Sequence, residues 1–370
     1  MSYPTVKMKD ITLIKTGKLD SNAAVDDGAY PFFTCDPNTL KINNWAYDTE
    51  AVLLAGNNAS GNYTAKYYKG KFNAYQRVYI IETADPLVLN IRYLCYALNQ
   101  QLRLLKTISS GSTTKFLTLG MLHGLDIPLP SIKVQEQIVY VLAAYDDLIE
   151  NNQKQIKLLE EAAQRLYKEW FVDLRFPGYE TTPITDGVPK GWKRERLVDI
   201  VKVQYGYAFD GSLFNANGNG TPIVRIRNIP AGTTADYTTE DADPQYVVHN
   251  SDILVGMDGE FHINSWSGPD AYLVQRTCSF RPNNPNMKGY LLQAIYEPIK
   301  YFESTVVGAT VAHLGKKHID TITVLTGPEE LYVPFQQYFE RRQLLLNQNR
   351  LLAEARDRLL PKLMNGEIEV

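Results

Sequence analysis

Polar segments beside glycines are where this sequence could do chemistry, and the best example of them fails as a catalytic motif. Gly56 and Gly61 have the spacing of a phosphate-binding loop. Asn62 and Tyr63 follow them, however, at the positions where such a loop carries Lys and then Ser or Thr. No side chain would reach a terminal phosphate, so we interpret the segment as a turn.

Other catalytic patterns are incomplete in the same way. Asp243, Pro244, Gln245 and Tyr246 approach the Asp-Pro-Pro-Tyr motif of amino methyltransferases, but the second proline is missing and no cofactor-binding glycine strand precedes them. The histidines do not occur at paired ligand spacing on a helix, which argues against a metal site; they are His123, His249, His262, His313 and His318. We also find no nucleophile–base pair. We therefore expect a chain that is not an enzyme by itself and holds no cofactor or metal.

The elements that position these segments occur twice. The pattern Asp-Ile-x-x-(Ile/Val)-x-x-Gly stands at residues 10–17 and again at 199–206. Two strand-like segments, an amphipathic helix and a glycine-hydroxyl loop then follow in each copy, at 51–56, 77–81, 91–105 and 111–114, and at 252–256, 277–280, 292–302 and 308–311. Each copy ends in a long helix. This order of matches predicts a duplicated α/β (α+β) fold.

The two long helices carry heptad seams. Residues 135–171 contain neither Pro nor Gly, which allows a helix of about 55 Å at about 1.5 Å per residue. The seam positions are Ile138, Leu142, Tyr145, Ile149, Asn152, Ile156, Leu159, Ala163, Leu166 and Trp170 in the first helix, and Leu331, Phe335, Tyr338, Arg342, Leu345, Asn349, Leu352, Arg356, Leu359 and Leu363 in the second. Polar residues inside a seam fix register and partner.

We therefore predict that the two helices pair with each other as an antiparallel coiled coil that separates two globular domains. The alternative is that each helix packs on its own domain. A helix of this length would overhang a domain of ~130 residues, whose radius of gyration is only about 14 Å.

Bulk composition describes a globular protein. The chain of 370 residues is long enough for two or three domains. It carries 38 Lys and Arg against 41 Asp and Glu, a net charge of −3, so any affinity for nucleic acid must come from local patches or from a basic partner. We expect no membrane span and no signal peptide. The three cysteines have no metal or redox spacing, so we expect reduced thiols and a cytoplasmic protein.

Six segments of the chain resemble a known family. Leu129 and Pro130 followed by Gln135, Glu136, Gln137 and Ile138, then Asp147, Ile149, Glu150, Asn151 and Asn152, then residues 166–173 (Leu-Tyr-Lys-Glu-Trp-Phe-Val-Asp), are similar to the central helical region of type I restriction–modification specificity subunits. Residues 189–192 (Pro-Lys-Gly-Trp), 222–226 and 360–368 are similar to the same family. The second helix departs from the family pattern at its start, where Val333, Pro334 and Phe335 precede Gln336 and Gln337.

That resemblance implies two target recognition domains, each of which reads half of a split site in double-stranded DNA, with a coiled-coil spacer between them. It implies two methyltransferase (modification) subunits as partners, which use S-adenosylmethionine, and restriction/translocase subunits that use ATP with magnesium. We place the first recognition domain at residues 1–130, the central helix at 131–176, the second recognition domain at 177–327 and the C-terminal helix at 328–370.

Candidate DNA contacts are the polar and basic residues on the loops of each domain, because amides and hydroxyls bind base edges and Lys and Arg bind phosphates. In the first domain they are Lys15, Lys18, Asn57, Asn58, Ser60, Asn62, Tyr63, Thr64, Arg77, Ser112, Thr113, Thr114 and Lys115. In the second domain they are Tyr205, Tyr207, Arg225, Arg227, Asn228, Asp258, His262, Thr310, His313, Lys316 and Lys317. For each residue alone, an ordinary solvated side chain is the alternative.

Candidate partner-docking or coiled-coil residues are Tyr145, Asn152, Trp170, Phe171, Arg342, Asn349 and Arg356. Core packing is the alternative for the three aromatic residues. A competing function for the whole chain is a coiled-coil adaptor whose paired domains bind protein. A self-sufficient nuclease or methyltransferase is disfavoured by the missing motifs.

Overall fold

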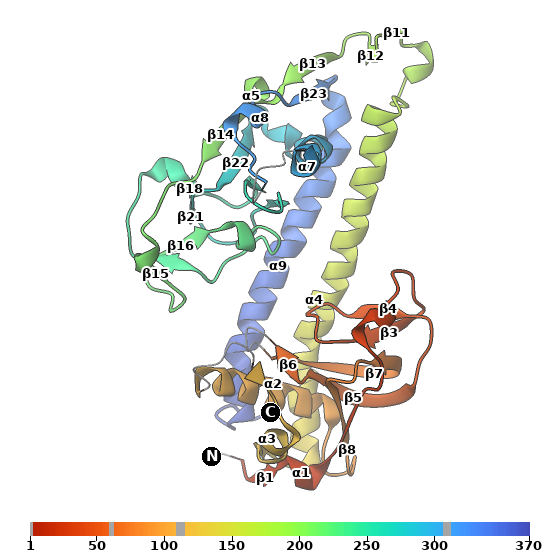
Figure 1. The fold of residues 1–370 in the computed structure, drawn as a ribbon, viewed down its shortest axis with the longest axis vertical. Helices are drawn as coiled ribbons and strands as arrows, with labels where there is room; N and C mark the ends of the chain where they lie inside the picture. The colour runs from red at the N-terminus through yellow and green to blue at the C-terminus, as the bar shows by residue number, and fades with distance from the viewer. Residues whose placement is uncertain (1–2, 59–62, 109–114, 306–311) are drawn as a thin grey trace. The chain divides into compact units, whose positions relative to one another are not determined.

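The structure is a computed structural model that describes residues 3–58, 63–108, 115–305 and 312–370. It divides into two compact units (Figure 1). Unit 1 comprises residues 1–147 and 353–370, and unit 2 comprises residues 148–352. Two long helices, α4 (Ile132–Tyr167) and α9 (Val333–Met364), contribute residues to both units.

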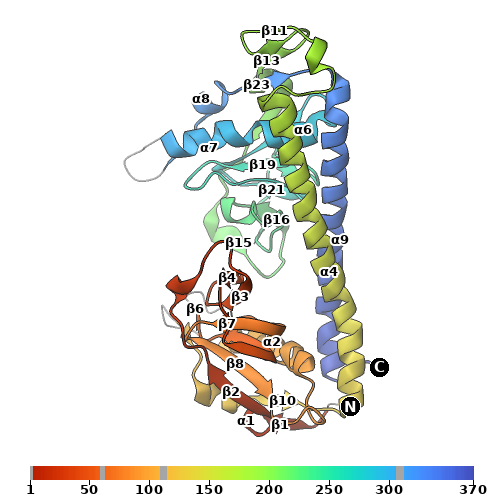
Figure 2. The ribbon, with the colours of Figure 1, turned by 90° about the vertical axis from the view of Figure 1, so that its right-hand side faces the viewer.

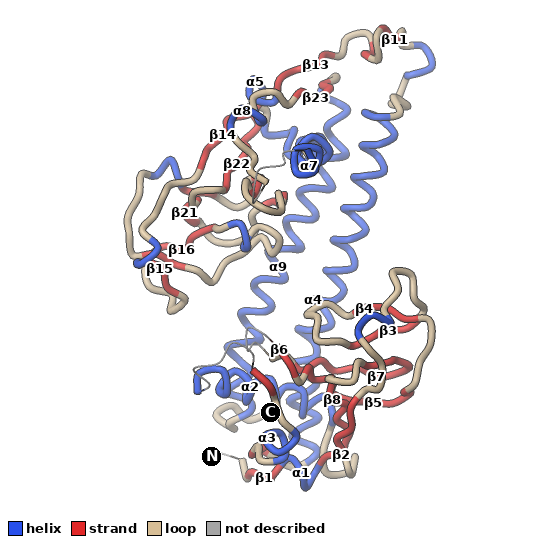
Figure 3. Tube along the Cα trace, in the orientation of Figure 1, coloured by secondary structure: helices blue, strands red, loops and turns tan. Residues whose placement is uncertain are grey.

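Unit 1 is built on a six-stranded sheet with the order β2-β8-β5-β7-β3-β4 (Figure 3). β3 runs parallel to β7, and the other neighbours are antiparallel. The elements are β1 (Thr5–Lys7), α1 (Met8–Ile11), β2 (Thr12–Thr16), β3 (Tyr30–Phe33), β4 (Leu40–Ile42), β5 (Tyr47–Ala55), β6 (Asn57–Asn58), β7 (Ala65–Ala74), β8 (Val78–Thr83), α2 (Ile91–Ile108), β9 (Lys115–Phe116), α3 (Leu119–His123) and β10 (Asp126–Pro128).

The central strand β5 is apolar on both faces because alternate residues belong to different clusters. Val52 and Leu54 lie in a cluster with α2, which covers one face of the sheet (Figure 2). Ala51 and Leu53 lie in a second cluster with Phe72 on the opposite face. Successive side chains of a strand point to opposite faces, so a strand covered on both sides becomes a continuous apolar run.

Unit 2 holds a four-stranded sheet, β14-β22-β19-β20, and a five-stranded sheet, β15-β17-β16-β21-β18. Its elements are β11 (Ile184–Thr185), β12 (Val188–Pro189), β13 (Lys193–Arg196), α5 (Leu197–Ile200), β14 (Val201–Tyr205), β15 (Phe214–Asn215), β16 (Thr221–Val224), β17 (Tyr237–Thr238), β18 (Val247–Val248), β19 (Ile253–Gly256), β20 (Ile263–Ser265), β21 (Ala271–Leu273), β22 (Thr277–Pro282), α6 (Lys288–Ala294), α7 (Tyr296–Thr305), α8 (Lys316–Ile319) and β23 (Thr323–Thr326). A π-helical turn, Lys168–Val172, follows α4.

The predicted duplication is confirmed in the strand pairing. β8 lies between β2 and β5 in unit 1, and β22 lies between β14 and β19 in unit 2, in both cases antiparallel to its neighbours. The strand pair β1–β10 of unit 1 has its counterpart in β13–β23 of unit 2. The two units therefore share one framework of strands.

The glycine of the duplicated motif is required by a close backbone approach. A Cβ atom on Gly17 would lie 2.2 Å from the carbonyl oxygen of Ala74, and one on Gly206 would lie 2.1 Å from that of Val274. Each glycine also donates its backbone N–H, to Val78 in unit 1 and to Thr277 in unit 2. Only a residue without a side chain fits at the end of β2 and β14.

The two long helices pair antiparallel, as predicted. In unit 2 Asn152 contacts Asn349 and Glu160 contacts Arg342, and in unit 1 Asp146 contacts Arg356, so partner numbers fall along α9 as they rise along α4. Every predicted seam residue is buried or half-buried. α9 begins at Val333 with Pro334 in its first turn, where the missing N–H of proline is harmless.

Two local predictions were wrong. The predicted helix over 292–302 is broken at Ile295 into α6 and α7. Asn57 and Asn58, predicted to lie in a turn, form the short strand β6, which pairs with β9. In the second case the partner strand lies more than fifty residues away along the chain, and local composition gives no sign of it.

We expect Gly17→Ala and Gly206→Ala each to lower the free energy of unfolding by about 1–3 kcal/mol or more, because the new methyl group would overlap a carbonyl oxygen. Gly211→Ala is the matched control, since a Cβ there meets nothing within 4 Å. Urea unfolding measures all three variants. Equal stabilities for Gly206→Ala and Gly211→Ala would contradict the explanation.

Candidate nucleic-acid interface

A tight turn joins the sheet strands β7 and β8 of unit 1. The N–H of Val78 donates to the carbonyl of Tyr75 over 2.9 Å, which closes a β-turn with Gln76 and Arg77 at its two central positions. Both central side chains are exposed. Gln76 donates through Nε2 to Asp20 Oδ1 over 2.8 Å. The turn therefore presents an amide and a guanidinium to solvent.

A shallow cavity of about 310 Å³ lies beside this turn. Its walls include Thr16 at the end of β2, Asn57 of β6, Arg77 and Phe116 of β9. Phe116 is 56% exposed, which is high for an aromatic side chain in a strand. The cavity thus combines a cation, an amide and an apolar surface, which are the groups that contact base edges in DNA.

The remaining unit 1 candidates occupy varied positions. Lys15 forms an ion pair with Glu82 at 2.8 Å, Lys18 and Thr64 are exposed, and Tyr63 is half-buried. For Asn58 and Lys115 only the backbone is described, in β6 and β9. The remaining candidates of this unit lie outside the described residues: Ser60, Asn62, Ser112, Thr113 and Thr114.

Unit 2 carries a turn with the same two central residues before β22, although Arg276 has a positive φ and Arg77 does not. Thr277 donates its N–H to the carbonyl of Val274 over 3.2 Å, and Gln275 and Arg276 occupy the central positions. Arg276 has a φ of 69°, in the left-handed region that favours glycine. A non-glycine residue there costs about 1–3 kcal/mol, and such strain clusters at functional sites.

Asp258 and His313, both predicted DNA contacts, lie beside the unit 2 turn. His313 Nδ1 lies 2.5 Å from Asp258 Oδ1, and Arg276 Nε lies 3.3 Å from Asp258 Oδ2. The Asp258 carboxylate therefore contacts both neighbours at once. The guanidinium remains accessible, since 55% of the Arg276 side chain is exposed.

Three candidates around η5 (Ile226–Asn228) are already engaged within unit 2. Arg227 donates two hydrogen bonds to Asp236, and Asn228 donates a third. Although burial opposes ionisation of Asp236, these hydrogen bonds lower its pKa. Arg225 lies over the ring of Phe214 at 5.5 Å. The network of Arg227, Asn228 and Asp236 holds the loop between β16 and β17.

The other unit 2 candidates are a mixed group. Burial raises the pKa of Tyr205 to about 12. Tyr207 packs against the rings of Phe209 and Tyr246. His262 lies 3.4 Å from Glu260, and Lys316 and Lys317 are exposed on α8. Thr310 lies outside the described residues.

The polar seam residues contact one another or a neighbouring charge. Asn152 donates to Asn349 Oδ1 over 2.9 Å in unit 2. Arg356 donates to Asp146 Oδ1 over 2.7 Å in unit 1. A shifted register would leave these half-buried groups without partners, so the pairs favour one alignment of the helices.

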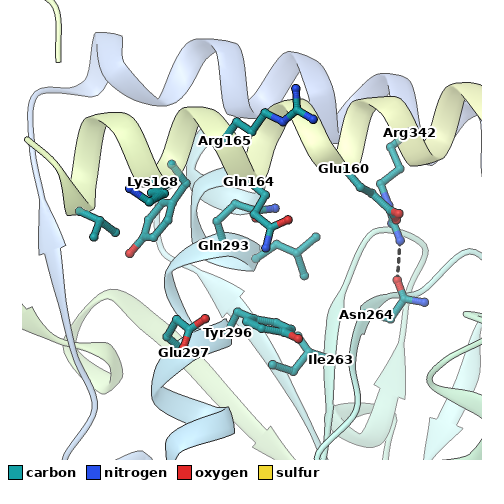
Figure 4. A pocket seen from close by; sticks show the side chains of 13 residues that line it. Glu160, Gln164, Arg165, Lys168, Ile263, Asn264, Gln293, Tyr296, Glu297 and Arg342 are labelled. Atoms are coloured by element: carbon teal, nitrogen blue, oxygen red, sulfur yellow. Dashed lines mark hydrogen bonds and ion pairs between the residues drawn. The ribbon is translucent and has the colours of Figure 1, made fainter. Parts of the chain in front are cut away.

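Arg342 extends from the seam into the globular part of unit 2. It donates to Glu160 Oε1, Ser265 Oγ and Asn264 Oδ1 over 2.6, 2.6 and 2.7 Å, and only 8% of the residue is exposed. Figure 4 shows Arg342 at one end of a cavity of about 650 Å³ between α4 and the segments that carry Asn264 and Tyr296. Arg342 of α9 therefore connects α4, through Glu160, to β20 of unit 2, through Asn264 and Ser265.

The aromatic docking candidates pack within the protein. Phe171 is buried among aromatic rings, including Trp192 at 5.0 Å and Tyr290 at 4.7 Å between centroids. Trp170 meets the ring of Phe335 edge-on. Tyr145 is half-buried on α4. For Phe171 and Trp170 the structure favours the core-packing alternative.

Gln275 and Arg276 are not among the residues predicted from the sequence. A signal was present, because Gln-Arg occurs at residues 76–77 and at 275–276, in each case immediately before a strand of the repeat, β8 or β22. A third Gln-Arg, at residues 164–165, lies in α4. Arg77 was named and its counterpart was not. Among the residues that the structure describes, no group of three or more His, Cys, Asp or Glu side chains could hold a metal ion.

Comparison with known proteins gives consistent matches. The family model described as type I restriction modification DNA specificity domain matches residues 2–161 and 189–331. A specificity subunit of the MjaIX type I restriction enzyme from Methanocaldococcus jannaschii is 30% identical over 77% of this chain and 70% of its own length. The EcoDI specificity subunit from Escherichia coli is 36% identical, but the match spans only 45% of this chain and 36% of that protein.

The fold has a counterpart among solved structures. The type I restriction–modification S subunit from M. genitalium matches with a TM-score of 0.58 at 16% identity, over 98% of this chain and 96% of that one. Two units with one strand framework and two long paired helices define a duplicated fold of this class. The chain belongs to the family of type I restriction–modification specificity subunits.

We expect Arg342→Ala to lower the free energy of unfolding by roughly 2–4 kcal/mol, because three hydrogen bonds from a buried cation are lost while Glu160 becomes solvated. Arg341→Ala is the matched control, since that neighbouring arginine is exposed and should change stability by less than about 0.5 kcal/mol. Denaturant unfolding measures both. A smaller effect for Arg342→Ala than for Arg341→Ala would refute the role assigned to Arg342.

Proposed function

We propose that this chain provides the sequence specificity of a type I restriction–modification complex by reading a split site in double-stranded DNA. Each recognition domain contacts one half of the site, with the first at residues 1–130 and the second at 177–327. The observation that carries this proposal is the repetition of one exposed Gln-Arg turn on the same strand framework in both units of a chain from a DNA specificity family.

Catalysis belongs to partners in this proposal. Two methyltransferase subunits, which use S-adenosylmethionine, modify the DNA, and restriction subunits that use ATP with magnesium cleave it. Support comes from the family membership and from the absence of recognisable catalytic motifs in the sequence. No helix in the described part of the chain is long and apolar enough to cross a membrane.

Charge also favours a complex over an isolated DNA-binding chain. With a net charge of −3 the chain has little general attraction for the phosphate backbone, which dominates the affinity of most DNA-binding proteins. The exposed Lys316 and Lys317 would supply local phosphate contacts, and a basic partner would supply the remaining ones.

We expect the complex with co-purifying methyltransferase subunits to select a split motif from a randomised duplex pool. Its affinity should fall with salt along a log–log slope of about −0.9 for each phosphate contact. The measurement is selection at two salt concentrations, with the chain alone as the control. Selection of no motif by the complex, together with binding of a protein ligand, would favour the adaptor function instead.

A second experiment tests the paired helices as a spacer. Deleting residues 149–155 together with 346–352 removes one heptad from each helix, centred on the hydrogen-bonded pair Asn152 and Asn349. The helices shorten by about 10 Å, or about 3 base pairs, so we expect an altered spacer between unchanged half-sites. Deleting 149–155 alone shortens α4 but not α9, so the seam residues of the two helices no longer align and the stability should fall. An unchanged spacer in the double deletion would refute the role of the helices as a ruler.

A further inference from the structure

The exposed Gln-Arg turns of the two units are held by the same backbone hydrogen bonds. In unit 1 the N–H of Gly56 donates to the carbonyl of Arg77 over 2.8 Å. In unit 2 the N–H of Met257 donates to the carbonyl of Arg276 over 2.9 Å. The arginine thus occupies the same site next to the end of the central strand, β5 in one unit and β19 in the other.

A second pair of bonds extends the equivalence to a neighbouring segment. Leu117 donates its N–H to the carbonyl of Gly56 over 2.9 Å, and Leu314 donates to that of Met257 over 2.8 Å. All of these bonds are made by backbone atoms. The frame that they form therefore does not depend on side-chain identity. The residues that flank these bonds can therefore be matched one to one.

The matched flanking residues differ between the units. Asn57 corresponds to Asp258, and Phe116 corresponds to His313, because each follows or precedes a residue of the shared frame. Within each unit the two are also cross-strand neighbours, Asn57 opposite Phe116 and Asp258 opposite His313. In each unit, therefore, an arginine lies beside a cross-strand pair of side chains. The pair is an amide and a phenyl ring in unit 1, and a carboxylate and an imidazole in unit 2.

Arg276 of unit 2 has a backbone conformation that glycine would adopt with less strain. Arg276 has a φ of 69°, and its side chain is too exposed to contribute to the core. Its contact with Asp258 restrains the guanidinium, which reduces the side-chain freedom lost when a ligand binds. Strain at an exposed, restrained cation points to a ligand for that cation.

We propose that Arg77 and Arg276 are equivalent base-reading residues, each donating two hydrogen bonds to N7 and O6 of a guanine in its own half-site. The neighbouring pairs make the half-sites differ. Asn57 suits the N6 and N7 edge of adenine and Phe116 the thymine methyl group, whereas Asp258 accepts from N4 of cytosine. The assignment rests on the proposed function, and it adds the residues and the base that the function requires.

The test is motif selection from a randomised duplex pool by the full chain in complex with its methyltransferase subunits. We expect Arg77→Ala and Arg276→Gly each to lower the preference for guanine at one position of one half-site by about 5- to 150-fold, the range that a bidentate contact supplies. The other half-site and the spacer stay unchanged. Glycine suits the backbone at residue 276, so Arg276→Gly should keep or raise the melting temperature.

Two further variants provide a control for the loss of charge and a test of the flanking pair. Arg194→Ala removes the same charge from the exposed surface of β13 and should leave the motif intact. The double variant Asn57→Asp with Phe116→His places the unit 2 pair in unit 1, and it should change only the bases next to the guanine of the first half-site. An unchanged motif in this variant would overturn the role of the flanking pair.

The outcomes separate this assignment from the proposed function. If wild-type complex selects a split motif but Arg77→Ala and Arg276→Gly only weaken binding to all sequences equally, the two arginines contact phosphates and the assignment is overturned while the function stands. If the wild-type complex selects no motif, the proposed function fails and the assignment fails with it. Loss of guanine at one position in each variant supports both.

Discussion

The burial of the C-terminal end of α9 in the core of unit 1 is the constraint on which the other features depend. Leu360, Leu363 and Met364 of α9 are buried in the same cluster as Ile138 and Leu142 of α4. At its other end α9 contributes Phe335 to the main cluster of unit 2. Since both ends of α9 are anchored by apolar burial, the helix has one path and must run antiparallel to α4 within each unit.

Apolar burial alone would not fix how the helices align, because a heptad seam can shift by one repeat at modest cost. The polar contacts choose the register. Arg342 is nearly inaccessible to solvent, and a shift would separate it from Glu160, Asn264 and Ser265 and leave a buried cation without acceptors. Such a state costs more than the contact contributes in the native register. The pairs of Asn152 with Asn349 and Arg356 with Asp146 act in the same direction.

Features set by local periodicity or by repetition could be predicted from the sequence. The seams of α4 and α9, the strands β5 and β19, and the glycines at 17 and 206 belong to this group, since each follows from a pattern in neighbouring residues. Features set by contacts between distant segments could not. The pairing of β6 with β9 joins residues 57 and 116, and the engagement of Arg227 by Asp236 depends on how one loop folds back.

The candidate site contains both kinds of feature, predictable and unpredictable from the sequence, within a single turn. The Gln-Arg dipeptides can be read in the sequence, yet their equivalence was not predicted, and the left-handed backbone of Arg276 and its contact with Asp258 appear only in three dimensions. A frame made of backbone hydrogen bonds tolerates substitution at 57, 116, 258 and 313 without loss of folding free energy from the frame itself. Under the proposed function, recognition can therefore change by replacing side chains on a fixed scaffold. Under the same proposal, such local contacts would contribute sequence discrimination in a chain of slightly negative net charge, and partner subunits would supply most of the phosphate contacts.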